Sequence, residues 1–286
     1  MSPLWWIWLA FCLLECVVAI YLNSYIVFFH GRSLTEGGKR NPVSLILIVM
    51  GINKMAMKCT WIVNDLKFWL PDIFDSLSSV VLLSFHIHFS YWLTAWLSIY
   101  YSIFITNFSH QMFLWIKRNL LAFLPQVLLL TGVVSLAIAL SYMWSHKVPS
   151  PIHYSTNGTQ NVSSIVEDVS LMSFYLIVSI SLGSCLSFTA IAISLVVSLS
   201  SLLKHVNNIS RSGFNVQVHV TLIKSMAVFL ILSVLSFFCY LINFIKMFKA
   251  PDPLYVVIQL LMLIIPTMES VVIIIASPKL RKNILG

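Results

Sequence analysis

Long apolar stretches dominate the pattern of hydrophobic and polar positions along this chain. Seven of them run for about 20 residues or more, and short polar segments separate them. The hydrocarbon core of a bilayer is about 30 Å thick, which a helix of about 20 residues crosses. Lipid offers no hydrogen-bond partner to an exposed backbone group, so each stretch is expected to be a helix. The predicted membrane spans are residues 5–29, 43–64, 77–105, 120–142, 170–203, 220–245 and 254–276.

Composition supports a membrane protein. The 286 residues are 59% hydrophobic and only 9% charged, which no soluble domain of this length matches. The segments between the spans are short, so we expect one domain over residues 1–286, without an extramembrane catalytic or nucleic-acid-binding domain. The first span has no basic segment before it and is too long for a signal-peptide core, so we expect it to be retained. The predicted fold class is an all-α membrane protein, a seven-transmembrane helix bundle.

The net charge of +8 indicates how this bundle is oriented. Eleven of the 17 Lys and Arg residues lie in segments on one side of the predicted membrane, and four lie on the other side. Cytoplasmic loops are enriched in basic residues, which places the N-terminus outside and the C-terminus in the cytoplasm. An odd number of spans, with the termini on opposite sides, favours a receptor over an enzyme. The basic excess therefore predicts topology and contact with anionic membrane lipid, and not nucleic-acid binding.

The longest predicted outer loop, 144–169, carries two N-glycosylation sequons, at Asn157 and Asn161. We expect glycan on at least one of them. Two further sequons, at Asn107 and Asn208, fall on the cytoplasmic side and should stay unmodified. All five cysteines lie inside predicted spans, so no disulfide is expected between the outer loops.

Four charged residues lie well inside the spans, where a charge costs on the order of 3 kcal/mol unless it is paired or faces a cavity. At about 1.5 Å per helical residue, Glu15 and Lys58 lie at matching depths, about 21 and 22 Å from the inner ends of their spans. Lys54 lies about 16 Å and Glu269 roughly 10 Å from the inner ends of theirs, so long side chains can bridge them. We expect two pairs, Glu15–Lys58 and Lys54–Glu269, in one polar network with Asn23. Two interpretations remain open: a static link between helices, and a network that rearranges on activation.

No pattern of catalysis or metal binding is present in the sequence. Neither H-E-x-x-H nor G-x-S-x-G occurs. His86 and His88 lie on adjacent faces of one predicted helix and cannot hold a metal by themselves. We therefore expect neither an enzyme nor a bound cofactor or metal.

Several segments resemble one receptor family. Residues 15–26 follow E-x3-A-x3-N-x-Y-I, and residues 88–101 contain H-F-S-Y-W-L-T and L-S-I-Y-Y. Residues 105–117 contain I-T-N-F-S and F-L-W-I-K. Residues 203–226 contain L-K-H and H-V-x2-I-K-S-M, and residues 266–282 contain P-x2-E-S and S-P-K-L-R-K. These motifs are similar to those of the bitter-taste receptors, the type 2 taste receptors among the G-protein-coupled receptors.

The resemblance implies a function for this chain, and the differences from the family pattern indicate how the chain departs from other members. It implies a multi-pass receptor of the plasma membrane that detects bitter small-molecule agonists and activates a heterotrimeric, gustducin-like G protein. At five positions the chain differs from the family pattern: Leu83 stands for Trp, Ile87 for Asn, Phe104 for Lys, Lys54 for Arg and Glu269 for His. We therefore expect a divergent or lineage-specific member.

Candidate ligand and G-protein contacts follow from this resemblance. Ligand sites in helix bundles form between helices, with apolar walls and few polar groups, so we expect a pocket in the outer half of the third, fifth, sixth and seventh spans. Packing between helices is the alternative role for each of these side chains. The candidate ligand-binding residues are Leu83, Ser84, Ile87, Phe237, Tyr240, Gln259 and Met262. The candidate G-protein-facing residues are Lys117, Lys204, His205, His219 and Lys224.

Two other classes of protein fit seven spans. A vomeronasal type 1 receptor, or another orphan chemoreceptor, shares the number of spans, but the motifs of the third span and of the segment between the fifth and sixth spans argue against it. A small-molecule transporter needs polar groups along a path through the bundle, and only the second and seventh spans offer them. Many transporters also show internal repeats, and this sequence has none.

Overall fold

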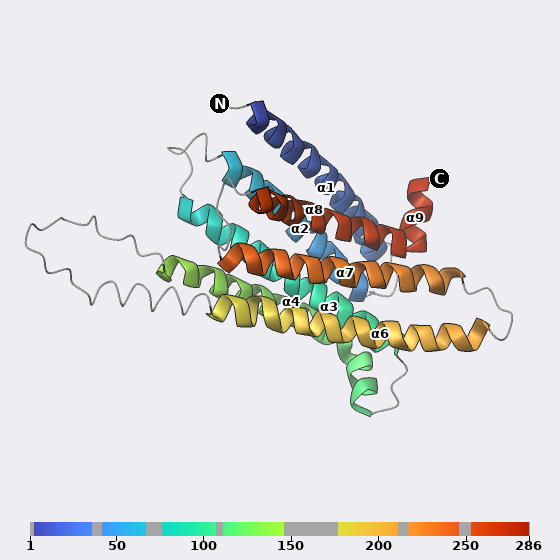
Figure 1. Ribbon diagram of the computed structural model, residues 1–286. Coiled ribbons are helices and arrows are strands. Elements are labelled where there is room, and N and C mark those ends of the chain that lie inside the picture. The colour runs from blue at the N-terminus through green and yellow to red at the C-terminus, as the bar shows by residue number, and fades with distance from the viewer. Residues whose placement is uncertain are drawn as a thin grey trace, which may run out of the picture.

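The computed structural model describes residues 3–35, 42–66, 76–106, 111–145, 177–210, 217–245 and 253–285. In this part of the chain, long helices lie side by side in a bundle, and a short last helix turns away from it (Figure 1). The helices are α1 (Pro3–Thr35), α2 (Pro42–Leu66), α3 (Ser76–Ile105), α4 (Gln111–Ser145), η1 (Ser179–Cys185), α6 (Leu186–Ser210), α7 (Gln217–Ile245), α8 (Pro253–Ala276) and α9 (Pro278–Leu285).

Seven helical segments among the described residues are long and apolar enough to cross a membrane. The all-α fold predicted from the apolar stretches is therefore confirmed. The fifth span, predicted to start at 170, is described from residue 177 onward, where η1 runs directly into α6. Several helices extend beyond their apolar stretches, because a polar segment can continue a helix outside the bilayer. α1 continues to Thr35, and α4 starts at Gln111.

The outward and inward faces of the bundle have the pattern of a membrane protein. Large apolar side chains such as Tyr21 on α1 and Leu129 on α4 are each 71% exposed. Lys54 and His88, in contrast, are buried. In water this arrangement would be costly, whereas in lipid the apolar faces need no cover. Helix packing around the buried apolar core, which includes Leu93 and Ile191, sets the positions of the polar residues inside.

The bundle has an N-terminal end and a C-terminal end. The N-terminal end holds the starts of α1, α3 and α8 and the ends of α2, α4 and α7 (Figure 1). The C-terminal end holds the ends of α1, α3, α6 and α8 and the starts of α2 and α7. Here α9 leaves the bundle axis, anchored by fully buried Leu280, whose carbonyl accepts a hydrogen bond of 2.9 Å from the Tyr25 hydroxyl of α1.

Prolines and one π-helical turn interrupt the regular helices. Pro125 lies inside α4, and Figure 1 shows the first turns of this helix set at an angle to the rest. Pro266 lies inside α8 and has no N–H to donate to the carbonyl of the preceding turn. η1 is a seven-residue π-helical segment. Such wide turns are rare in helices and are frequently found at functional sites.

Candidate functional site

The four charges inside the membrane form two ion pairs. Lys58 of α2 lies 2.7 and 2.8 Å from the two carboxylate oxygens of Glu15 on α1. Lys54, one turn away on α2, lies 2.9 Å from Oε2 of Glu269 on α8. All four side chains are at least nine-tenths buried. Both pairs match those expected from depth along the helices.

The two lysines also hold the backbone of α8 around its proline. Lys54 donates to the carbonyl of Pro266 at 3.1 Å, and Lys58 donates to the carbonyl of Leu263. The Thr267 hydroxyl donates to Glu15. Each ammonium group therefore binds one carboxylate and one carbonyl, and together they join α1, α2 and α8 around the interrupted turn.

Asn23 belongs to this network through a different contact. Its side-chain oxygen accepts a hydrogen bond of 2.9 Å from Ser270 on α8, and its amide donates to the carbonyl of Ala19 at 2.8 Å. On the other side of α2, the Asn53 amide donates to the carbonyl of His86 on α3 at 3.1 Å. Helices α1, α2, α3 and α8 are thus linked by buried polar groups, which must be satisfied internally in lipid.

A cavity lies beside this network, between α2, α3, α7 and α8. We call it the Glu269 cavity. No residue of η1 or α6 is among its described lining residues, so it differs from the predicted pocket, in which the fifth span took part. The lining residues are Met57, Trp61, Ile87, Ser90, Tyr91, Thr94, Ser236, Tyr240, Met262, Pro266 and Glu269.

Three of the seven candidate ligand-binding residues line this cavity: Ile87, Tyr240 and Met262. Leu83 does not. It lies one turn from Ile87 toward the N-terminal end, where it packs against the cluster of Cys12, Trp61 and Leu263 from α1, α2 and α8.

The remaining candidates have other neighbours. Phe237 stacks on Phe188 of α6, with ring centroids 4.3 Å apart and planes 9° apart. The Gln259 amide donates to the Asn243 side chain of α7 at 2.9 Å, so it joins α7 to α8 at the N-terminal end. Ser84 is half-buried on α3 and is outside the lining set. Helical spacing alone did not show which of the candidate residues pack against other helices and which line the cavity.

Several lining residues were not among the sequence candidates, although the sequence contained a signal for them. Met57 and Trp61 share one face of α2 with Lys54 and Lys58, at spacings of three, four and seven residues. Charges must face the interior of a membrane bundle, so this face could have been assigned to the interior. The same spacing from Ile87 marks the other α3 residues in the wall. The missed residues are Met57, Trp61, Ser90, Tyr91, Thr94 and Ser236.

Tyr240 connects the cavity to the π-helical turn of η1. Its ring is part of the cavity wall, and its hydroxyl lies 3.3 Å from Nε2 of His88 and 3.3 Å from the hydroxyl of Ser179 in η1. Ser179 is itself 2.9 Å from the same His88 nitrogen. The fully buried His88 ring packs directly on Gly183, which has no Cβ to obstruct it. One hydroxyl thus joins the cavity wall, α3 and η1.

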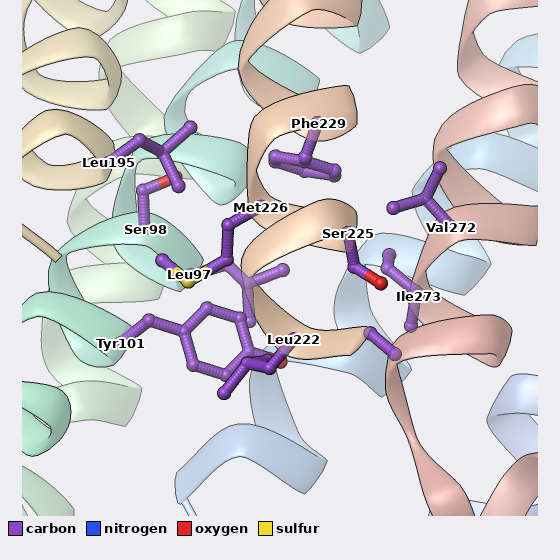
Figure 2. A pocket seen from close by; sticks show the side chains of 11 residues that line it. Leu97, Ser98, Tyr101, Leu195, Leu222, Ser225, Met226, Phe229, Val272 and Ile273 are labelled. Carbon is purple, nitrogen blue, oxygen red and sulfur yellow. The ribbon is translucent and has the colours of Figure 1, made fainter. Parts of the chain in front are cut away.

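A second cavity lies toward the C-terminal end, and Figure 2 shows its side chains converging from α3, α6, α7 and α8. It is mostly apolar and contains no charged residue among its described lining. Its lining residues are Leu97, Ser98, Tyr101, Leu195, Leu222, Ser225, Met226, Phe229, Val272, Ile273 and Ala276.

Four of the five candidate G-protein contacts lie at this same end, on α6 and α7. Lys204 on α6 and Lys224 on α7 are exposed. Lys117, His205 and His219 lie on α4, α6 and α7, and their side chains are outside the described set. The sequons at Asn157 and Asn161 also lie outside the described residues.

Within the described helices, no three His, Cys, Asp or Glu side chains gather closely enough to hold a metal ion. The five cysteines are free thiols located on helices. The arrangement offers an apolar cavity with one carboxylate, bounded by helices that buried polar groups tie together. Such a site can bind a small molecule between helices.

Comparison with known proteins identifies the family. The family model for taste receptor protein (TAS2R) matches residues 1–286. Taste receptor type 2 member 41 of Pan paniscus is 25% identical over 291 residues, which cover 96% of this chain and 92% of that receptor. Member 41 of Mus musculus is 28% identical over 245 residues, covering 82% and 79%. Member 9 of Macaca mulatta is 25% identical over 284 residues, covering 95% and 89%. The chain therefore belongs to the taste receptor (TAS2R) family.

Proposed function

We propose that this taste receptor detects bitter small molecules in the Glu269 cavity and activates a heterotrimeric, gustducin-like G protein. The observation that carries the proposal is the position of the cavity, whose walls come from α2, α3, α7 and α8. A molecule bound there contacts four helices at once. It can therefore favour one arrangement of the bundle over another through its difference in affinity for the two.

Two connections lead from the cavity toward the rest of the bundle. Through Glu269 and Pro266, the wall is continuous with the lysine network that holds α8. Through Tyr240, it is continuous with His88 and the π-helical turn. We propose that an agonist moves α7 and α8 through these contacts, so that the polar network rearranges on activation and is not a static link.

The C-terminal end is the side on which we place the G protein. Exposed Lys204 and Lys224, together with Lys279 and Arg281 on α9, make this end basic. The positive-inside rule then orients it toward the cytoplasm of a plasma-membrane receptor. These basic side chains contact anionic lipid as well as the G protein.

The two alternative functions considered from the sequence, a vomeronasal receptor and a transporter, are less well supported. The family match over the whole chain disfavours a vomeronasal type 1 receptor. A transporter requires a polar path through the bundle, whereas the second cavity, toward the C-terminal end, is mostly apolar.

The test is a calcium assay in cells that express the receptor with a chimeric G protein, screened against a panel of bitter compounds. Ile87→Trp fills the cavity and should abolish the response at wild-type surface expression. Leu129→Trp, on the exposed face of α4, is the matched control and should respond normally. Full responses from Ile87→Trp would place the agonist elsewhere, and silence of the wild-type receptor toward the whole panel would overturn the proposed function.

A further inference from the structure

We propose that Glu269 binds a protonated amine carried by the agonists of the Glu269 cavity, a proposal that rests on the proposed function of this cavity. A carboxylate and three aromatic rings line the same space. The lysine that pairs with this carboxylate is outside the described lining. The cavity therefore offers a carboxylate and aromatic surface to an organic cation.

The distribution of charge favours a cation over an anion. Glu269 is the one formally charged side chain among the described residues that line the cavity. Its Oε2 is 2.9 Å from Lys54, whose side chain is 1% exposed and also donates to the carbonyl of Pro266. A cation in the cavity meets the carboxylate first and the ammonium group behind it. Coulomb energy falls with distance, so the attraction prevails over the repulsion.

The other ion pair does not alter this balance. Lys58 is occupied by both oxygens of Glu15 and by the carbonyl of Leu263. None of these three residues is among the described lining of the cavity. Each lysine near the cavity thus has its own carboxylate, and no unpaired positive charge in the described network repels an ammonium group.

The Glu269 carboxylate adds a strong hydrogen-bond acceptor to a wall that also carries hydroxyl groups. The hydroxyls of Tyr91 and Ser236 lie 3.0 Å apart and bond to each other, and that of Tyr240 lies within 3.3 Å of His88 and Ser179. The carboxylate of Glu269 can only accept. An ammonium group has N–H donors and no acceptor, which matches this carboxylate.

The aromatic side chains supply the rest of the site. Trp61 of α2, Tyr91 of α3 and Tyr240 of α7 come from three different helices and share the cavity with Glu269. Ring faces attract cations within about 6 Å of their centroids, most strongly those of Trp. Met57 and Met262 add polarisable, adaptable surface for the apolar part of the ligand.

Matched pairs of compounds test this proposal in the wild-type receptor. N-benzylpiperidine and N-benzoylpiperidine share a skeleton, but the nitrogen of the first is protonated at neutral pH and the amide of the second is not. In the calcium assay, the amines of a set of such pairs should be more potent than their amides by about tenfold or more, as expected for a charge contact that contributes to affinity. Equal or greater potency of the amides would overturn the assignment while leaving the proposed function intact.

Variants locate the contact. Lys54→Met/Glu269→Gln removes both charges together and strands neither. Whatever its overall signalling, the ratio of amine potency to amide potency should fall to about one, so that the preference for amines is lost. Met57→Leu changes the wall without changing charge and should keep that preference. An amine preference that survives in the double variant would overturn the role of Glu269. If the double variant does not reach the cell surface, the wild-type comparison of amines with amides decides. Failure of the receptor to respond to any compound would instead remove the proposed function, and this proposal with it.

Discussion

Lys54 and Glu269 form a buried ion pair of 2.9 Å between α2 and α8, at positions where the family pattern has Arg and His. Removing one partner leaves the other charge buried and unpaired, which costs about 3–5 kcal/mol. Lys54→Ala or Glu269→Ala alone should therefore sharply lower surface expression or shift basal activity. The exchange Lys54→Glu/Glu269→Lys should recover part of the loss. Surface labelling and basal calcium signalling measure both effects.

Two outcomes would contradict this prediction. If the single variants traffic and signal normally, the pair does not contribute to folding or to the resting state. A charge exchange no better than the worse single variant would show that the two residues do not act as partners.

Gly183 gives a prediction about the π-helical turn of η1. A Cβ at this position would meet the ring of His88, which is fully buried. Gly183→Ala should therefore destabilise the receptor by about 1–3 kcal/mol, as overpacking of a core does. Gly132→Ala is the control, because its Cβ would approach Phe89 at an ordinary 3.6 Å. Thermal denaturation of detergent-solubilised receptor measures both.

A double-variant cycle separates this steric cause from a general loss of helix quality. In a His88→Ala background the ring is gone, so Gly183→Ala should add little further destabilisation. The steric account fails if Gly183→Ala costs as much there as in the wild type.

Ile87 and Leu83 lie one turn apart on α3 but should respond differently to substitution. Ile87 lines the Glu269 cavity, whereas Leu83 packs beside Trp61 and Leu263. Ile87→Asn should change the spectrum of agonists more than it changes surface expression. Leu83→Asn should mainly lower expression, because it puts a polar group into an apolar cluster. Identical dose–response curves for every agonist at matched expression of Ile87→Asn would argue against a ligand site at this position.

Tyr240→Phe tests the connection from the cavity to η1. The substitution keeps the ring in the cavity wall and removes the hydroxyl that lies 3.3 Å from both His88 and Ser179. We expect basal activity or maximal response to change, with the rank order of agonists preserved. Tyr100→Phe is the control, because Tyr100 is a half-buried tyrosine of α3 outside the described lining of the cavity. A reordered agonist series with unchanged basal activity would indicate that the hydroxyl contacts ligand instead.

Glycosylation tests the orientation of the bundle. At least one of Asn157 and Asn161 should carry glycan in the outer loop, and Asn107 and Asn208 should not. Removal of N-glycans should shift the wild-type protein on a gel. A shift that persists in Asn157→Gln/Asn161→Gln would contradict an extracellular N-terminus.

The fold was predictable from the sequence because insertion into a membrane depends on the hydrophobicity of a whole segment and not on single residues. About 20 apolar residues in a row have few alternatives to a helix. The pairs Glu15–Lys58 and Lys54–Glu269 were predictable for a related reason: a buried charge needs a partner at its own depth.

The walls of the cavity were only partly predictable. Spacing along a helix gives the shared face of Leu83 and Ile87 but does not show which neighbouring helix each one meets. The stacking of Phe237 on Phe188 and the hydrogen bond from Gln259 to Asn243 depend on rotations of α7 and α8 that periodicity does not fix. The π-helical turn at Gly183 was also missed, because the local sequence permits an ordinary α-helix and the ring of His88, which packs on this turn, is distant in the chain.

The order in which the two ion pairs can form during synthesis follows from their places in the chain. Glu15 precedes Lys58, so their pair is available once α1 and α2 are in the membrane. Lys54 enters with the same α2, but Glu269 emerges from the ribosome only with α8, close to the end of translation. Until then the ammonium group of Lys54 lacks the carboxylate that neutralises it, and an unpaired charge inside the membrane is energetically costly. A nascent chain of this receptor therefore carries an unpaired charge on α2 within the membrane until α8, its last transmembrane helix, is inserted.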